Sequence, residues 1–521
     1  MKTILNIAMK TAGVFLMSAL LFSCSDEVLD SINRDNDHPK SVESKYILAE
    51  VLTSTAFYNI GGDLNTYLAT YIEHEVGIHN QLYYAETRMG EPSSSSTFNN
   101  VWENLYRSLR DARIVIDQCS DGGRDEGNRV TRGIAEVLAA YNSALITDMF
   151  GDAPWVEAAL VDESGLPKFM TPKVDRQEDI YRQIMQLLDD AIADLQGSDS
   201  SPVGNYDLLY SGDKSKWLKL AYGLKARYTL HLLTRATGLE AELDRILDYV
   251  SSSFASAADQ AAFNIYDASN MNPLFDFQWS RDGLAASRSL SEKMVERNDP
   301  RLRRVFVDNN WSQIAGDPEA DNYFMAPNGT PEQLQAHYNT SIFVYSQLAS
   351  TMFLSYHELL FIKAEALARK GSPEAESVLR EAVIAAMANT EASVAAAFGA
   401  PEVNRYGGLE ETTDPIEPDE AAEYFDTEVK PRFDAEPLKE IMIQKYLAFF
   451  GASGESTEAY NDIRRLKALN EPFITLANPG KFPLRCGYGN SDTTTNPNVG
   501  EAFGDGQYVY SEPVWWAGGN R

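Results

Sequence analysis

Residues 353–386 read FLSYHELLFIKAEALARKGSPEAESVLREAVIAA, and this stretch predicts a helix, a tight junction and a second helix. Apolar residues recur at steps of three and four on both sides of the junction, which is the period of one helical face. In the junction, Arg369 favours a helix C-terminus and Gly371 suits the left-handed residue that follows it. Ser372 can cap the next helix, and Pro373 fits a first helical position. A few consecutive residues therefore close one helix and open another.

The same helical period recurs along the chain and predicts a mainly α fold made of four helical pairs. The pairs are 134–149 with 180–195, 217–233 with 239–254, 353–367 with 375–386, and 438–450 with 457–466. Alanines on the inter-helix faces of the third pair allow close packing, and this arrangement is similar to tetratricopeptide architecture. The spacing between pairs is not constant, so the repeat carries large insertions.

These insertions lie near 79–98, 255–350, 390–437 and 470–521 and are expected to be loops. Loops this long in a compact helical protein usually carry binding or docking surfaces.

The composition excludes some classes of partner. The 521 residues include 76 acidic and 45 basic side chains, giving a formal net charge of −31. The electrostatic field of so negative a chain repels nucleic acid and anionic lipid surfaces. Apart from Cys24, only Cys119 and Cys486 are present. We expect these two to be buried thiols, although a single bridge between them stays open.

The N-terminus predicts export. Two lysines and an apolar run over 12–22 form a signal peptide, 1–23, whose apolar run is about half of the ~20 residues that a membrane-spanning helix needs. Leu21 and Ser23 before Cys24 resemble a bacterial lipobox, so we expect Cys24 to carry the lipid and 24–45 to act as a tether. An ordinary signal peptide with an incidental cysteine is the alternative. No later segment is expected to span a membrane, so membrane contact is through the lipid anchor only.

Several segments, in a fixed order, resemble a known family. They are WENLY at 102–106 with DAR at 111–113, DMFGDAPW at 148–155, RNDPRL at 297–302, the helix at 356–369, and IQKY at 443–446 with AYNDIRR at 459–465. Together they resemble the SusD/RagB-like outer-membrane nutrient-binding lipoproteins, in the broader SusD-like branch. The tail departs from the family at 486–489, where CGYG replaces an expected Tyr-Pro sequence.

The resemblance implies a single SusD-like helical domain over 46–521 and a place at the outer membrane, facing the cell exterior. It implies a partner, a SusC-like TonB-dependent transporter, on which the protein acts as a hinged lid that captures a nutrient oligomer, most simply a glycan. It also implies no enzymatic activity and no cofactor. The acidic Ser25-Asp26-Glu27 that follows the lipidated cysteine resembles an export signal for the outer face.

Exposed aromatic rings beside amide and carboxylate groups suit sugars, whose C–H faces stack on the rings while their hydroxyls take hydrogen bonds. The predicted ligand-binding residues are Tyr83, Tyr84, Trp279, Trp311, Tyr323 and Tyr338, the last four with Gln278, Asn309, Asn310, Asn322 and Asn339 as polar neighbours. For each aromatic, a partly buried packing role is the alternative. We assign the remaining tryptophans, Trp102, Trp155, Trp217, Trp515 and Trp516, to the scaffold.

Other polar motifs are interpreted as structural. The turn at 298–301 combines Asn, Asp and Pro, which are typical of a corner. Arg464 and Arg465, together with Glu358 and Glu365, are expected to form salt bridges between helices. The acidic stretch 410–423 could bind calcium loosely, but a solvated surface loop is the preferred interpretation.

Catalytic motifs are weak. His74 and His79 flank Glu75, but they are five residues apart where a zinc-protease helix needs four. No Gly-rich phosphate loop is present. Three alternatives to a glycan binder stay open: the same fold with a peptide ligand, a helical lipoprotein glycoside hydrolase, and a structural component that touches no ligand.

Overall fold

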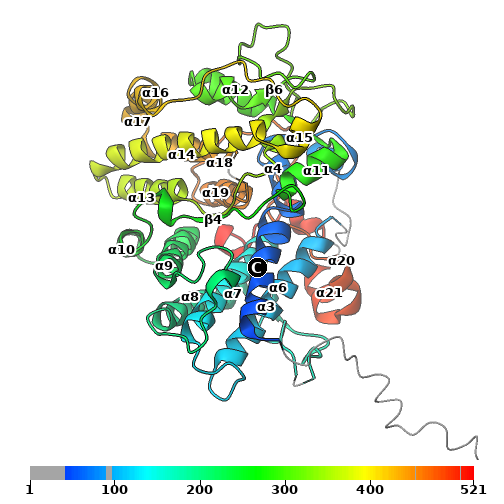
Figure 1. The fold of residues 1–521 in the computed structure, drawn as a ribbon, viewed down its shortest axis with the longest axis vertical. Helices are drawn as coiled ribbons and strands as arrows, with labels where there is room; N and C mark the ends of the chain where they lie inside the picture. Colours follow the sequence, from blue (N-terminus) through cyan, green and yellow to red (C-terminus); the bar gives the residue numbers. More distant parts are fainter. Residues whose placement is uncertain (1–41, 90–96, 163, 452, 505) are drawn as a thin grey trace, which may run out of the picture. The chain divides into compact units, whose positions relative to one another are not determined.

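The computed structural model describes residues 42–89, 97–162, 164–451, 453–504 and 506–521 (Figure 1). The compact unit is Ser44–Arg521. The predicted signal peptide, Cys24 and most of the tether lie outside the described residues, as does the serine run of the first insertion.

The four predicted helical pairs are confirmed. They are α7 (Arg129–Phe150) with α8 (Gln177–Asp194), α9 (Lys214–His231) with α10 (Leu239–Ser251), α13 (Tyr356–Arg369) with α14 (Glu374–Phe398), and α18 (Pro437–Phe449) with α19 (Ser456–Ala468). Members of each pair pack against each other. At the α13–α14 junction Gly371 has φ +68° and the Ser372 hydroxyl accepts a hydrogen bond from the Glu374 amide at 3.3 Å. The fold is therefore mainly α, as predicted.

Further α-helices surround the pairs. Within the described residues they are α3 (Ser44–Ser54), α4 (Asp63–Tyr71), α5 (Asn80–Thr87), α6 (Asn99–Cys119), α11 (Pro273–Arg281), α12 (Arg288–Glu296), α15 (Pro401–Arg405), α16 (Pro418–Tyr424), α17 (Lys430–Ala435), α20 (Asn490–Thr495) and α21 (Pro497–Phe503). Helix α7 is buried along most of its length between α6 and α8. Its sequence is apolar nearly all round, which is the pattern of a core helix. By contrast, α6 buries a single apolar stripe.

Strands are short and pair antiparallel two by two. The pairs are β1 (Glu75–Gly77) with β5 (Leu284–Ala286), β2 (Ala153–Pro154) with β3 (Val174–Asp175), β4 (Ala261–Phe263) with β8 (Thr351–Leu354), and β6 (Phe306–Val307) with β7 (Thr340–Ser341). Single turns of 3₁₀ or π helix are η1 (Thr55–Ile60), η2 (Gly204–Tyr206), η3 (Leu232–Arg235), η4 (Ala257–Asp259), η5 (Pro300–Arg303), η6 (Ile342–Tyr345), η7 (Phe425–Val429), η8 (Gln507–Tyr510) and η9 (Trp515–Ala517). In β1–β5, Val76 lies opposite Ala285, so the strands join the start of the chain to the long insertion.

The expectation that the insertions are loops was wrong for part of each of the four, and the second, 255–350, contains α11 and α12. Residues 80–87 form α5, most of 390–437 is helical because α14 continues to Phe398 and α15 to α17 follow, and the tail contains α20 and α21. Acidic and polar residues suggested loops there, but tertiary packing overrides such weak local preferences. Trp516 and Cys486 of the tail are buried in the core.

The expectation that no later segment could span a membrane also needs correction. Residues 374–405 are long and apolar enough by length and composition alone. The alanines that make this stretch apolar pack against α13, and Glu391 within it pairs with Arg304. These contacts are those of a long helix packed within the fold.

Ion pairs buried between helices link the second, third and fourth pairs. Arg227 of α9 binds Glu358 of α13 at 2.6 Å, and Glu365 of α13 binds Arg465 of α19 at 2.6 Å. The predicted salt bridges are therefore confirmed for these residues. Arg464 is the exception, since its guanidinium donates to the Asp148 carbonyl at 2.7 Å and to other uncharged acceptors.

Cys119 and Cys486 are both buried and form no disulfide with each other. Trp102, Trp217 and Trp516 are fully buried, as the scaffold assignment requires. Trp155 is nearly so and Trp515 is half-buried. The tail is held partly by the Cys486 amide, which donates to the Met149 carbonyl at 2.7 Å.

Candidate functional site

Trp279 and Trp311, both predicted from the sequence, meet in one pocket. Their ring centroids are 5.8 Å apart. Trp279 lies on α11, a helix that begins at Pro273 and is capped by the Asn272 side chain, which accepts from the Leu274 amide at 2.9 Å. Trp311 lies in the loop after β6, and both rings are half-buried. A helix and a loop thus present two indoles side by side.

Further rings extend this pair. Phe275 stacks on Trp279 from within α11 at 5.5 Å, and Tyr345 lies 6.1 Å from Trp311. Tyr406, just after α15, lies 5.7 Å from Trp279, and 66% of it is exposed. These rings form one wall of the pocket, and the other side is open to water. A ligand with a flat apolar face can therefore stack on the rings.

The pocket has a volume of about 280 Å³. Its polar lining includes Gln278, Asp282, Asp308, Asn309 and Thr340. These groups provide carboxylate and amide acceptors and amide and hydroxyl donors around the rings. Gln278 and Asn309 were predicted as polar neighbours of the two tryptophans.

The acidic groups of the pocket are held by hydrogen bonds. The Asp282 carboxylate accepts from the Gln278 side chain at 2.9 Å and from the Ala336 amide, and burial raises the pKa of Asp282. The Asp308 carboxylate accepts from the backbone amides of Asn310 and Ser312 at 2.8 and 3.0 Å. Both side chains are therefore oriented before any ligand arrives.

Tyr345 closes the pocket from η6. Burial, and then the nearby Asp282 carboxylate, raise the pKa of Tyr345 to about 12. The side chains of Thr340 and Trp311 hydrogen-bond its hydroxyl. The phenol is thus neutral at any physiological pH and ties Trp311 to the pocket wall.

The Trp311 loop is fixed by the acidic stretch 410–423. Trp311 has φ +64°, a left-handed conformation that is uncommon for a bulky residue. Its carbonyl accepts from the Glu410 amide at 2.9 Å, and the Gln313 amide donates back to the Glu410 carbonyl at 3.0 Å. The segment after Tyr406 therefore holds the turn at Trp311 through backbone hydrogen bonds of the kind that join neighbouring strands.

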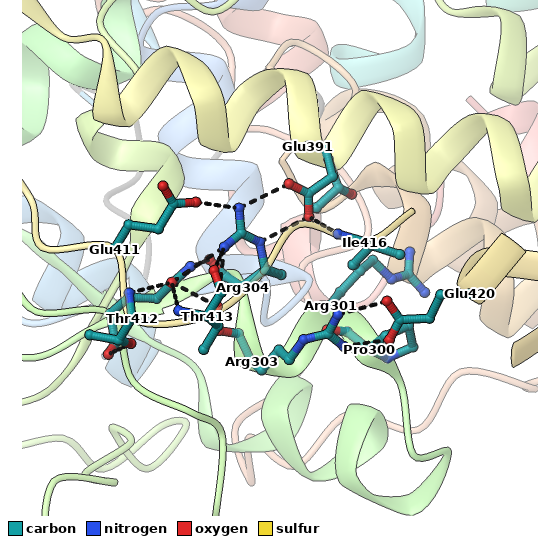
Figure 2. Close-up of polar contacts among 12 residues, drawn as sticks. Pro300, Arg301, Arg303, Arg304, Glu391, Glu411, Thr412, Thr413, Ile416 and Glu420 are labelled. Carbon is teal, nitrogen blue, oxygen red and sulfur yellow. Dashed lines mark hydrogen bonds and ion pairs between the residues drawn. The ribbon is translucent and has the colours of Figure 1, made fainter. Parts of the chain in front are cut away.

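Two arginines hold that acidic segment in place, as Figure 2 shows. Arg304 binds Glu391 of α14 at 3.0 Å and Glu411 at 2.9 Å, and it also donates to Thr413. Arg303 binds Glu420 with two hydrogen bonds of 2.8 Å. The expectation of a solvated loop was thus wrong for part of the stretch, because arginines from η5 and just after it neutralise its carboxylates.

The polar turn before these arginines is structural, as predicted. Asp299 caps η5 by accepting from the Arg301 amide at 3.0 Å, and its carboxylate forms a buried ion pair with the Arg301 side chain. The corner therefore sets the direction in which Arg303 and Arg304 leave the chain.

The other predicted aromatics lie elsewhere. Tyr338 is only 5% exposed and packs with Val76 and Ala285, and its hydroxyl accepts from the Glu332 amide at 3.0 Å. Tyr323 is half-buried, and its hydroxyl bonds Ser291. These contacts are those of packing residues, the alternative stated for each.

Tyr83 and Tyr84 lie on α5, not in a loop, with ring centroids 6.0 Å apart. Tyr84 is 59% exposed and Tyr83 is half-buried. Neither lines the Trp279–Trp311 pocket.

Sequence reasoning missed Tyr345, Tyr406, Asp282 and Asp308. Tyr406 precedes two glycines in a segment far from Trp279 along the chain, so only folding brings the two rings together. No spacing rule could have identified it.

The weak catalytic motif around His74 is part of the core. His74 is buried, and its Nε2 lies 3.0 Å from the Tyr446 carbonyl. In the part of the chain that the structure describes, no group of three His, Cys, Asp or Glu side chains could hold a metal ion.

Comparisons with known proteins agree with this architecture. A SusD-like family model, described as starch-binding and associating with the outer membrane, matches residues 40–489. A SusD/RagB family protein from Bacteroides thetaiotaomicron is 55% identical, with a TM-score of 0.87 over 92% of this chain and 100% of that chain.

More distant structures share the fold alone. A chitin-binding protein is 21% identical with a TM-score of 0.68, over 90% of this chain and 99% of its own. A SusD homologue from Bacteroides fragilis is 20% identical with the same TM-score, over 92% of this chain and 100% of its own. The search of curated proteins gave no match. The family match over most of the chain, together with the helical pairs, shows that the protein belongs to the SusD-like family of outer-membrane-associated nutrient-binding proteins.

Proposed function

We propose that this protein binds a glycan oligomer at the Trp279–Trp311 pocket and passes it to a SusC-like TonB-dependent transporter. The observation that carries the proposal is the pair of half-buried indoles 5.8 Å apart, bordered by the carboxylates of Asp282 and Asp308. Rings that stack on C–H faces beside oriented acceptors for hydroxyl groups are the chemistry that sugars require.

The charge of the chain supports a neutral ligand. A net charge of −31 repels anionic oligomers and favours neutral or cationic ones, including neutral glycans. The family is described as starch-binding and one structural relative as chitin-binding, and both terms refer to neutral polysaccharides or their derivatives.

The ligand class is tested by capture. The purified protein, without its signal peptide, is incubated with an immobilised glycan panel and, separately, with a tryptic peptide pool. We expect retention by one glycan class and none by peptides. Binding of peptides alone would contradict the glycan proposal while leaving the fold and the transport role intact.

The proposal includes attachment through a lipid on Cys24, at the outer membrane and facing the exterior. Replacing Cys24 with Ala should move the protein from the membrane fraction to the soluble fraction and leave its glycan affinity unchanged. Retention of Cys24→Ala in the membrane would contradict lipid anchoring. Co-purification of the wild type with a SusC-like barrel tests the partner, and its absence under mild detergent would contradict the lid role.

We propose no catalysis and no cofactor beyond the lipid. Incubation with the captured oligosaccharide should release no shorter products. Product release that disappears when one acidic residue is replaced would instead establish a glycoside hydrolase. Calcium binding at 410–423 is tested by calorimetric titration of calcium into protein that has been treated with a chelator. We expect no saturable binding heat, because Arg303 and Arg304 already pair with Glu420 and Glu411.

A further inference from the structure

We infer that the ligand path does not end at the aromatic pocket but continues around the C-terminal end of α11 into a second, larger groove lined by η1, α4 and α6. The groove provides a separate subsite, so the protein distinguishes long glycan chains from short ones. This inference rests on the proposed function, since it takes the Trp279–Trp311 pocket as the first subsite.

The second groove has a volume of about 710 Å³ and is open to solvent. Its apolar lining includes Phe57, Phe277 and Met271, which are half-buried, and Tyr58, which is 51% exposed. An exposed tyrosine above a floor of apolar side chains again provides a stacking surface.

Amides and charged groups surround these rings. The polar lining is Asp63, Thr66, Gln81, Asn100, Glu103, Asn104, Arg107, Ser269, Asn270, Asp276, Ser280 and Arg281. Such a mixture offers both donors and acceptors to hydroxyl groups, whereas an apolar ligand would leave those groups unpaired. The chemistry of the groove therefore matches that of the aromatic pocket.

Helix α11 lies between the two sites and contributes side chains to both. Trp279 and Gln278 face the aromatic pocket, whereas Asp276, Phe277 and Ser280 line the large groove. The nine residues of α11 span about 13 Å, so one extended oligomer can reach both sides.

A third hollow, of about 330 Å³, adjoins the large groove and lies next to the aromatic pocket along the chain. It shares Ser280 and Arg281 with the large groove and is also lined by His79, Asn80 and Gln335. The Gln335 side chain donates to the Arg281 carbonyl at 2.6 Å.

The aromatic pocket begins at the next residue along each of two segments. Asp282 follows Arg281 and Ala336 follows Gln335, and Asp282 and Ala336 both line the aromatic pocket. Arg281, Gln335 and Ala336 are exposed, so an oligomer can pass over them without displacing buried groups.

Size supports the same conclusion. Sites that enclose a drug-sized ligand usually measure about 300–1,000 Å³. The aromatic pocket, at about 280 Å³, is at the lower edge of that range and has room for a short part of an oligomer. The large groove lies within the range, and it supplies the space for the remainder of the chain.

The test compares short and long probes by isothermal titration calorimetry. Maltose and maltoheptaose, with chitobiose and chitohexaose in parallel, are titrated into the wild type, Tyr58→Ala, Trp279→Ala and Tyr206→Ala. Tyr58 and Tyr206 are both exposed tyrosines, but Tyr206 lines neither site and serves as the matched control.

We expect Tyr58→Ala to weaken binding of the long probe by roughly two- to tenfold, the contribution of one aromatic contact, and to leave the short probe unchanged. Trp279→Ala should weaken both. An unchanged affinity of Tyr58→Ala for the long probe would overturn the second subsite while leaving the proposed function in place. Wild-type protein that binds neither series and is retained by no member of the glycan panel would overturn both.

Circular dichroism and thermal unfolding of each variant separate loss of fold from loss of contact. Arg107→Ala, at another exposed position in the large groove, provides an independent second variant. Equal losses for short and long probes in both Tyr58→Ala and Arg107→Ala would also contradict the subsite.

Discussion

The ionic contacts between α9, α13 and α19 and the aromatic pocket beside α11 use polar side chains in opposite ways. Between the helices, Arg227 pairs with Glu358 and Glu365 pairs with Arg465, and all four side chains are buried. In the pocket, the indole rings of Trp279 and Trp311 are half-buried, so part of each ring faces solvent. Backbone amides donate hydrogen bonds that orient the Asp308 carboxylate. Polar groups that are already paired specify the fold, and polar groups that are oriented but accessible are available to a ligand.

The comparison predicts that the two regions can be damaged separately. Variants in the ion-pair network should unfold the protein more easily without changing the affinity of the molecules that remain folded. Variants in the pocket should do the reverse. Each prediction below tests one side of that separation.

The largest effect is expected for Arg465→Ala. This change leaves the buried Glu365 without its strongest partner, and breaking a buried pair costs about 3–5 kcal/mol. Urea unfolding should show that loss. The matched control is Arg245→Ala, since Arg245 pairs with Glu242 at an exposed position and should change stability by about 0.5 kcal/mol or less. Similar losses in the two variants would contradict the assigned role of burial.

The second effect depends on pH and concerns His231. Burial lowers the pKa of His231, but Glu458 at 2.8 Å and Asp148 at 3.4 Å raise it more, to about 9. Because the folded pKa exceeds the unfolded value, the stabilisation is fully present below pH 6.5 and is lost as the pH rises through about 9.

His231→Gln should therefore destabilise the protein by up to about 3 kcal/mol below pH 6.5, and progressively less toward pH 9. Unfolding of the two proteins at each pH isolates this residue, since all other groups titrate in both. A difference that does not change with pH would show that folding does not shift the pKa of His231, and a difference that grows as the pH rises above 6.5 would show that the pKa is lowered; either would contradict the raised pKa.

The third effect is on binding. Trp279→Ala and Trp311→Ala should each weaken binding of the captured glycan by about 2 kcal/mol, a loss of affinity of roughly thirtyfold, as is typical of a central aromatic contact. Both rings are half-buried at the edge of the core, so the change in stability should be smaller than that of Arg465→Ala. Unchanged affinity in both variants would mean that the protein binds elsewhere or is a structural component only.

The smallest effect is expected for Arg304→Ala, which acts on the pocket indirectly. Losing the bonds to Glu391 and Glu411 frees the segment that supports the Trp311 turn (Figure 2). Affinity should fall by about 1 kcal/mol, roughly fivefold, and near-UV circular dichroism of the Trp279–Trp311 pair should change. Arg304→Lys keeps the charge but not the two-pronged geometry, so it should restore only part of both signals.

Sequence reasoning succeeded where the signal is local. The apolar period and the Arg369–Ser372 junction predicted the helical pairs, because capping and amphipathic packing depend on neighbouring residues. Glu358 and Glu365 were assigned to salt bridges between helices, and they lie about two helical turns apart on one helix. Trp279 and Trp311 were predicted as ligand-binding by residue type within a long insertion; the structure brings them into one pocket, and their binding role stays a prediction.

The parts that could not be predicted depend on contacts between distant segments. Tyr406 directly follows α15 and meets Trp279 only in the folded chain, and nothing near Tyr406 in the sequence encodes that contact. Tyr338 is chemically similar to Tyr406 but is buried in a small apolar cluster. Exposure of an aromatic ring is a property of the fold, so composition cannot separate ligand-binding rings from packing rings.

The most direct test of the central claim is a crystal structure of the protein with a saturating oligosaccharide of the captured class. The account predicts a sugar ring stacked on Trp279 or Trp311, with its hydroxyls within hydrogen-bonding distance of Asp282, Asp308 or Asn309. Sugar bound at a surface that contains neither tryptophan would contradict it.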